Sequence, residues 1–78
     1  MNLEIITPDK KLYEGNVKMA NFPGSDGSFG VLDNHAPMIA VLKAGKVELT
    51  EDNNNKVVFD VKGGVVEVLK NKVIVLAD

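Results

Sequence analysis

The chain has 78 residues, of which 45% are hydrophobic and 26% are charged, and its net charge is −2. This length allows one domain and excludes a second. All nine basic residues are lysines, so the chain lacks the basic excess of a nucleic-acid-binding protein and has no arginine to stabilise a transferring phosphoryl group. It also has no cysteine, which excludes disulfides, thiolate nucleophiles and cysteine-ligated metals.

No segment predicts export or direct membrane insertion. The first four residues carry no cationic stretch ahead of an apolar one, and the longest apolar runs, Met38–Leu42 and Val73–Ala77, are five residues long. A domain of this size buries only about 60% of the surface that its unfolded chain exposes. The sequence therefore predicts one module, residues 1–78, of modest stability and supported by a partner surface.

Short runs of valine, isoleucine and leucine recur between turn residues, and helical spacing is hard to find. This pattern is typical of an all-β sandwich or barrel. We expect about nine strands from the pattern alone. In the first part of the chain they are Leu3–Thr7, Lys11–Glu14 and Val17–Phe22, separated by the turn Pro8-Asp9 and by Gly15.

The middle of the chain is its least regular stretch. The loop Gly24–Gly30 holds three of the seven glycines, and Val31-Leu32 and then Asp33–Pro37 follow it. We interpret both segments as loops that connect strands, because glycine, serine, asparagine and aspartate are the residues of tight turns.

The second half predicts two hairpins. Asp52–Asn55 is expected to be a hairpin tip, because asparagine and aspartate tolerate left-handed backbone. Gly45 separates two strands, and Gly63-Gly64 marks a bulge or corner where a missing Cβ permits a sharp bend. The last two strands are apolar at nearly every residue and should be central in the sandwich. The expected strands are Met38–Leu42, Lys46–Glu51, Lys56–Lys62, Val65–Leu69 and Val73–Ala77.

The loops contain the residue types of a hydrolytic triad, which requires geometry and not sequence order. The plainer interpretation is that tight loops use serine, aspartate and glycine, and no Gly-x-Ser-x-Gly motif is present. The sequence therefore indicates no catalytic residue. The residues in question are Ser25, Ser28, Asp26, Asp33 and the single histidine, His35.

No pattern indicates a metal or a phosphate ligand either. With one histidine, a metal site would need carboxylates scattered over separate hairpin tips. The glycine spacing in Gly24–Gly30 is similar to a phosphate cradle, but no long helix and no suitable lysine follow it. Lys46, after Ala44-Gly45, lacks the serine or threonine of a Walker motif. We expect no cofactor and no small-molecule ligand.

His35 has two interpretations from the residues alone: a loop histidine hydrogen-bonded to local backbone, or an exposed contact residue. It precedes Ala36-Pro37 and lies on neither a helix face nor a strand face. The pattern does not separate the two.

Several segments resemble the epsilon subunit of bacterial F-type ATP synthases, and the chloroplast epsilon and mitochondrial delta subunits. The resemblance extends in the family's order and spacing along essentially the whole chain, and several glycines and the Asn-His-Ala-Pro segment agree at once. The segments are Leu3–Pro8, Leu12–Gly15, Gly24–Pro37, Leu42–Gly45, Gly63–Val68 and Val73–Asp78.

The resemblance implies a flattened β-sandwich of about ten short strands at the foot of the central stalk. The module would be a non-catalytic rotor part that fixes the gamma subunit to the c-ring and couples proton flow to ATP synthesis. It would lie at the cytoplasmic face of the bacterial plasma membrane, held there through the complex and not inserted in the bilayer. No bond would be made or broken on it, and no cofactor is implied.

The resemblance also implies two contact segments. His35, Ala36 and Pro37 match a segment that faces gamma, and Gly27, Ser28 and Phe29 match a loop that approaches the polar loops of the c-ring. Structural turns are expected at Gly30, Gly45, Gly63 and Gly64.

Two departures from the family's pattern matter. The family often has an acidic residue where Ser28 stands, so a salt bridge to a basic c-ring loop does not carry over; Asp26 or Asp33 could replace it. Most members also continue after the position of Asp78 into a regulatory helical hairpin, which is missing from this sequence.

Two other classes of function remain open at this point. A lysine-modified carrier module, with Lys10 or Lys70 as the modified residue, has a similar length and an all-β fold. Its lysine should lie near mid-chain, however, between two similar halves that this sequence lacks. A free-standing ligand-binding sandwich is allowed by the fold, but the sequence provides no pocket chemistry for it.

Overall fold

The computed structural model describes residues 1–78, and all of its regular structure is β-strand. The predicted all-β fold is confirmed. None of the elements is a helix with the length and apolar character to span a membrane. The strands are β1 (Asn2–Ile6), β2 (Lys11–Phe22), β3 (Phe29–Leu32), β4 (Met38–Glu51), β5 (Lys56–Leu69) and β6 (Lys72–Ala77).

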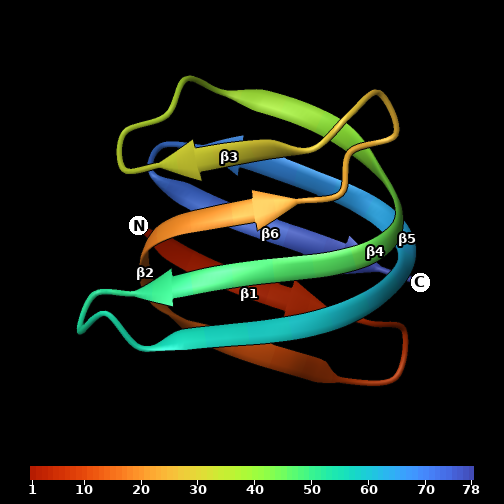
Figure 1. The fold of residues 1–78 in the computed structure, drawn as a ribbon, viewed down its shortest axis with the longest axis horizontal. Coiled ribbons are helices and arrows are strands. Elements are labelled where there is room, and N and C mark those ends of the chain that lie inside the picture. The colour runs from red at the N-terminus through yellow and green to blue at the C-terminus, as the bar shows by residue number, and fades with distance from the viewer.

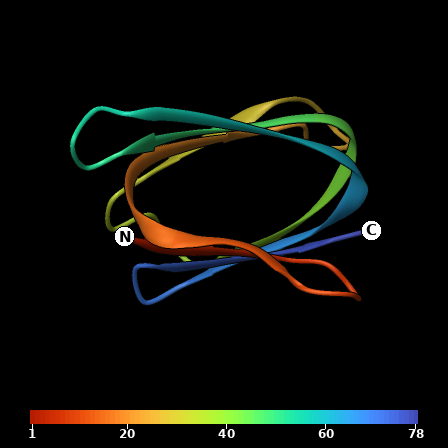
Figure 2. The same cartoon turned by 90° about the horizontal axis from the view of Figure 1, so that it is seen from below.

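The strands form one sheet that folds over on itself into two layers (Figures 1 and 2). The strand order is β1-β6-β5-β4-β2-β3, and β1 also pairs with β2, which closes a ring. We call the two layers lower and upper after their places in Figure 2. The lower layer contains β1, β6, the first halves of β2 and β4, and the second half of β5. The upper layer contains β3, the second halves of β2 and β4, and the first half of β5.

The expected count of about ten short strands becomes six, because three strands are long and bend from one layer to the other. Each of β2, β4 and β5 joins two of the predicted strands into one. In Figure 2, β4 and β5 make this crossing on the right-hand side and β2 makes it on the left. The sandwich is confirmed, and its two layers share continuous strands.

The glycines of β4 and β5 lie at the crossing, inside continuous strands (Figure 2). The bend expected at Gly63-Gly64 is present, whereas the turns expected at Gly45, Gly63 and Gly64 are absent. The ladder runs on through the bend, with Lys43 opposite Gly63 and Gly45 opposite Val61. Gly63 and Gly64 have φ values of 148° and 145°, which side chains rarely adopt. These glycines let the strand change direction while its hydrogen-bonded ladder continues.

The expectation of a turn at Gly30 is wrong. Gly30 lies inside β3 and pairs with Asn21 of β2. A Cβ at this position would be 2.9 Å from the Asn21 side-chain oxygen, so glycine serves close packing between two strands here.

The core fills the space between the layers and consists of 16 buried apolar residues. No buried residue is polar or charged. Buried positions mostly alternate with more exposed ones, as the two-residue period of a strand requires, and the alternation is interrupted at the register shift in β2 and at the bend in β4. The fully buried members with the largest side chains are Phe22, Leu3, Ile5, Leu49, Val17, Val31, Val47, Val66, Val68, Val73 and Val75.

One side of the sandwich is closed by a hydrogen bond between the layers. The Tyr13 hydroxyl, from the lower half of β2, donates to Glu51 Oε2 at 2.6 Å, and the Tyr13 ring meets the Phe59 ring edge-on with centroids 5.6 Å apart. Burial and the Glu51 carboxylate together raise the pKa of Tyr13 to about 12. Hydrogen bonds from Tyr13 and Asn55 lower the pKa of Glu51.

A pH titration tests this bond. Tyr13 is the only tyrosine and there is no tryptophan, so ultraviolet absorbance of the phenolate reports this residue alone. The expected midpoint is near pH 12, and Glu51→Gln should lower it. Because the folded pKa lies above the ordinary value of 10.0, the stabilisation is complete below pH 10 and is lost as the pH rises toward about 12. Glu4→Gln is the control, since Glu4 pairs with Lys11 and Lys72 instead. A midpoint near 10 in the unchanged protein would contradict the hydrogen bond.

Glycine-to-alanine substitutions test the crossing. A Cβ on Gly64 would be 2.2 Å from the Leu76 carbonyl oxygen, at a φ of +145°, whereas a Cβ on Gly27, with φ +130°, would meet nothing within 4 Å. Backbone strain alone costs about 1–3 kcal/mol. We expect Gly64→Ala to lower the free energy of unfolding in urea by about 2 kcal/mol or more beyond the effect of Gly27→Ala. Equal effects of the two substitutions would show that backbone strain alone, without the steric clash, explains the need for glycine at Gly64.

Candidate functional site

The two contact segments expected from the sequence lie at opposite ends of β3 (Figure 1). The loop Gly24–Ser28 precedes this strand and the loop Asp33–Pro37 follows it. Two partners could therefore be contacted at the same time without competing for one surface.

The first loop has a polar, exposed tip, and an apolar side chain beside the tip packs against the core. Gly27 and Ser28 are exposed, whereas Phe29 is half-buried and its ring lies 5.5 Å from the Phe22 ring in the core. The Gly27 N–H donates to the Gly24 carbonyl oxygen at 3.0 Å, and the Ser25 N–H donates to the Val41 carbonyl oxygen at 2.9 Å. Of the three residues expected to face the c-ring, Gly27 and Ser28 supply the accessible surface and Phe29 holds the tip in place.

Of the two aspartates that could replace an acidic residue at Ser28, one is free and one is already bonded. Asp26 is exposed in the same loop and forms no ion pair. Asp33 Oδ1 lies 2.6 Å from the amino nitrogen of Met1, which also donates to the Val17 carbonyl oxygen at 3.0 Å. Asp26 is therefore the available carboxylate beside Ser28.

The second loop is held by local hydrogen bonds. The His35 N–H donates to the Leu32 carbonyl oxygen at 3.2 Å, and the Asn34 N–H donates to Asn71 Oδ1 at 2.8 Å. Nδ1 of the half-buried His35 donates to the Ala36 carbonyl oxygen at 2.7 Å. His35 thus forms the hydrogen bond to local backbone, while Ala36 and Pro37 are exposed beside it.

A large apolar surface that the sequence reasoning missed covers the outside of the lower layer. Val41, Val65 and Leu76 lie opposite one another on β4, β5 and β6, and Ile6 of β1 continues the row. Val41 and Leu76 are exposed by 59% and 54%. The near-continuous apolar pattern of Val65–Leu69 and Val73–Ala77 predicted that these two strands are central in the sandwich. They are central within the lower layer, but their outer face is open.

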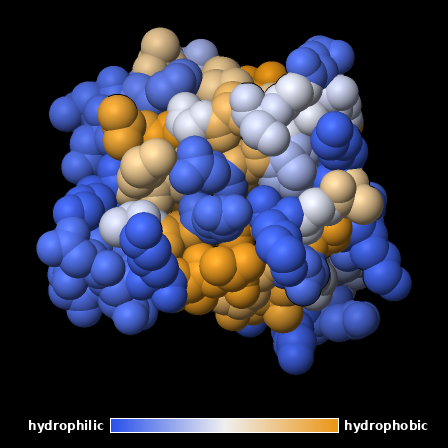
Figure 3. Space-filling view, viewed as in Figure 1, coloured by the Kyte–Doolittle hydropathy of each residue, from blue (hydrophilic) through white to orange (hydrophobic).

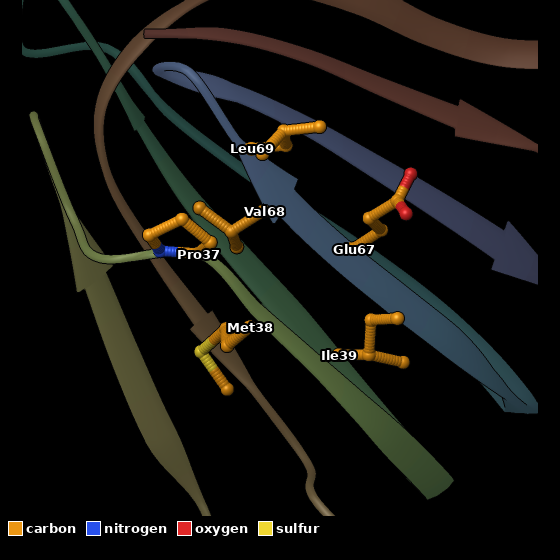
Figure 4. Close-up of a pocket in the computed structure, with 6 residues that line it drawn as sticks. All are labelled: Pro37, Met38, Ile39, Glu67, Val68 and Leu69. Carbon is orange, nitrogen blue, oxygen red and sulfur yellow. The ribbon is translucent and has the colours of Figure 1, made fainter.

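This lower face meets the second loop at a shallow hollow of about 370 Å³, lined by residues of β4 and β5 (Figure 4). Glu67 and Ile39 lie opposite each other on neighbouring strands, and Ile39 is exposed by 71%. Glu67 forms no ion pair, so a free carboxylate sits within apolar surroundings. The lining residues are Pro37, Met38, Ile39, Glu67, Val68 and Leu69.

The outside of the upper layer has a different character. It faces the viewer in Figure 3, where hydrophilic residues surround an apolar area. Lys46 Nζ and Asp60 Oδ1 form an ion pair 2.8 Å long across β4 and β5. Val58 and Leu32 are exposed apolar side chains on this side. The two outer faces thus differ, and the lower one carries the longer apolar row.

The structure does not assemble catalytic chemistry from the loop residues. Ser28 and His35 lie on either side of β3, and Asp33 is bonded to the Met1 amino group. No group of three or more histidine, aspartate or glutamate side chains is arranged to hold a metal ion.

Comparison with known proteins identifies the family. The model of the family described as "ATP synthase, Delta/Epsilon chain, beta-sandwich domain" matches residues 1–78. The chain is 42% identical over 78 residues to the ATP synthase epsilon chain of Leptospira borgpetersenii, covering all of this chain and 61% of that one. It is 41% identical over 76 residues to the epsilon chain of Chlorobium limicola, covering 97% and 86%. The chain spans only about 60% of the length of the relatives from Campylobacter curvus and Leptospira.

Two solved structures share the fold. A chain of the mitochondrial ATP synthase of Euglena gracilis superposes with a TM-score of 0.90 at 21% identity, over 96% of this chain and 48% of that one. A chain from the central stalk and c-ring of the Tetrahymena thermophila enzyme gives 0.80 at 20% identity, over 99% and 62%. With the match of the family model over the whole chain, these comparisons show that the chain belongs to the delta/epsilon family of ATP synthase chains, through its β-sandwich domain.

Proposed function

We propose that this chain is a non-catalytic rotor component of a proton-translocating F-type ATP synthase. It joins the gamma subunit to the c-ring and so couples proton flow to ATP synthesis, at the cytoplasmic face of the bacterial plasma membrane. The observation that carries the proposal is the family match over all 78 residues.

The architecture supports this role through its rigidity. The strands close a ring around one apolar core, and β2, β4 and β5 each belong to both layers. The layers therefore cannot slide over each other without breaking continuous strands. A module that transmits torque between two partners needs this stiffness between its contact surfaces.

The gamma side is proposed to comprise His35, Ala36 and Pro37 together with the adjoining lower face. Exposed apolar area of this extent usually marks a protein–protein contact, and the core of such contacts is apolar. Ile39 and Leu69 of the lower face lie beside Pro37 in the hollow, so one partner could cover this face and the second loop together. The local bond of His35 would hold Ala36 and Pro37 in the conformation that gamma meets.

The c-ring side is proposed to be the tip formed by Gly27, Ser28 and Phe29. The tip is polar and exposed, which suits contact with the polar loops of a ring and not with a buried apolar surface. Asp26 provides the negative charge that a basic loop would attract, in place of the acidic residue that the family often has at Ser28.

A charge substitution on each outer face tests the gamma side. Val41→Lys, on the lower face, should weaken the binding of purified gamma about tenfold or more, because an unpaired ammonium group would be buried in the contact. Val58→Lys is the matched control, since Val58 is exposed by 53% on the upper face. His35→Ala should weaken the same binding partially. If Val58→Lys weakened gamma binding and Val41→Lys did not, the two faces would have to be exchanged.

A substitution in the first loop tests the c-ring side. Asp26→Lys should weaken attachment to the c-ring and leave gamma binding intact, at a cost of about 1–2 kcal/mol for one contact. Asp9→Lys, in an exposed turn, makes the same charge change as a control. In membranes rebuilt with the Asp26 variant, ATP hydrolysis should continue while proton pumping falls. The reason is that the catalytic head still turns over when the rotor slips, but less torque reaches the c-ring. A strictly proportional fall of hydrolysis and pumping would contradict the assignment.

A further inference from the structure

The first half of β4 is an open edge of the lower layer. From Met38 to Lys43 it pairs with β5 on one side. On its other side no strand follows, and the only bridge is the isolated pair Gly24 and Leu42. A strand edge of this kind presents unpaired backbone groups to any chain that approaches.

The direction of these backbone groups follows from two hydrogen bonds. The Val41 carbonyl oxygen accepts from the Ser25 N–H at 2.9 Å, and the Lys43 N–H donates to the Pro23 carbonyl oxygen at 2.8 Å. Both bonds point away from β5. Because backbone groups alternate with a period of two residues, the N–H and C=O of Ile39 and the N–H of Val41 point the same way. The chain from Pro23 to Ser25 thus bonds the outer side of β4 at Lys43 and Val41. The outward groups between Val41 and Met38 have no strand beside them.

The edge carries no charged residue. Charged residues are one of the features that usually keep a strand edge from pairing with another chain. The edge formed by the first half of β5 carries Lys56 and Lys62, and that of β2 carries Lys11 and Glu14. Met38–Val41, in contrast, is uncharged and apolar throughout.

A free carboxylate lies beside this edge. Glu67 lies opposite Ile39 in the hollow at one end and has no ion-pair partner. At the other end, Ile39, Ala40 and Val41 line a second hollow of about 290 Å³ together with the first loop. A segment that binds along the edge would therefore meet apolar side chains and, beside Ile39, a negative charge.

We propose that Met38–Val41 accepts an extended segment of the partner chain by strand addition. Main-chain hydrogen bonds to Ile39 and Val41 provide the register, and a basic side chain of the segment pairs with Glu67. Strand addition to an open edge is a common mode of peptide recognition. The inference rests on the proposed function, which makes gamma the partner on this side.

Amide hydrogen exchange, followed by NMR with and without purified gamma, is the direct test. In the free protein the amides of Ile39 and Val41 should exchange quickly, and that of Ala40 should be protected by its bond to β5. Addition of gamma should slow exchange at Ile39 and Val41 by about tenfold or more. If gamma binds and both amides still exchange quickly, strand addition is wrong and the proposed function stands. If gamma does not bind, both fail.

Two substitutions add independent readouts. Ile39→Pro removes the outward N–H, a change that an edge strand tolerates, and should lower the affinity for gamma at least about tenfold. Ile39→Val keeps this N–H and should bind normally.

Glu67→Gln should weaken the binding of gamma severalfold and reduce the salt dependence of this binding. Glu48→Gln is the control: it makes the same change at an exposed residue of the upper layer and should have no effect. Equal affinities of the proline and valine variants, or of the two glutamine variants, would overturn the proposal. The exchange measurement does not depend on the folding of any variant.

Discussion

The rest of this structure depends on the crossing of β4 and β5 between the two layers. These strands pair along almost their whole length, so they must bend together. The bend is possible because glycines occupy both strands there, and Gly63 and Gly64 of β5 have φ values that a side chain would oppose. Once the pair is bent, one half of each strand lies in each layer. The core between the layers, the open edge of β4 and the apolar lower face all depend on this bend.

The sequence predicted the strands and the family, and it predicted the connections between strands less well. Period-two alternation is a local property, so Val17–Phe22 and Lys46–Glu51 could be assigned from their own residues. Whether a glycine ends a strand or bends it depends on what pairs alongside. Gly63 and Gly64 continue a ladder because β4 and β6 lie on either side of them. Gly30 looked like a turn for the same reason, since its partner Asn21 is nine residues away in sequence.

The resemblance predicted two contact segments but not their geometry. The positions of Ser28 and His35 at opposite ends of β3 required the fold, and so did the bond that occupies Asp33. The lower face was missed because apolar residues at every position of a strand predict burial on both sides. In this chain one side of these strands is buried in the core and the other is exposed. An apolar residue at every position of a strand therefore does not by itself predict burial of both sides within the domain.

The pairing of β1 with β6 has a mechanical consequence. The first and last strands of the module lie side by side and run parallel, from Asn2 opposite Lys72 to Ile6 opposite Leu76. The two chain ends therefore emerge at opposite ends of the sandwich (Figure 1). A force that pulls these ends apart loads all hydrogen bonds of the pair at once, in shear, instead of opening them one after another. A component placed between a driving and a driven part would resist stretching along this axis far better than a sandwich whose terminal strands unzip.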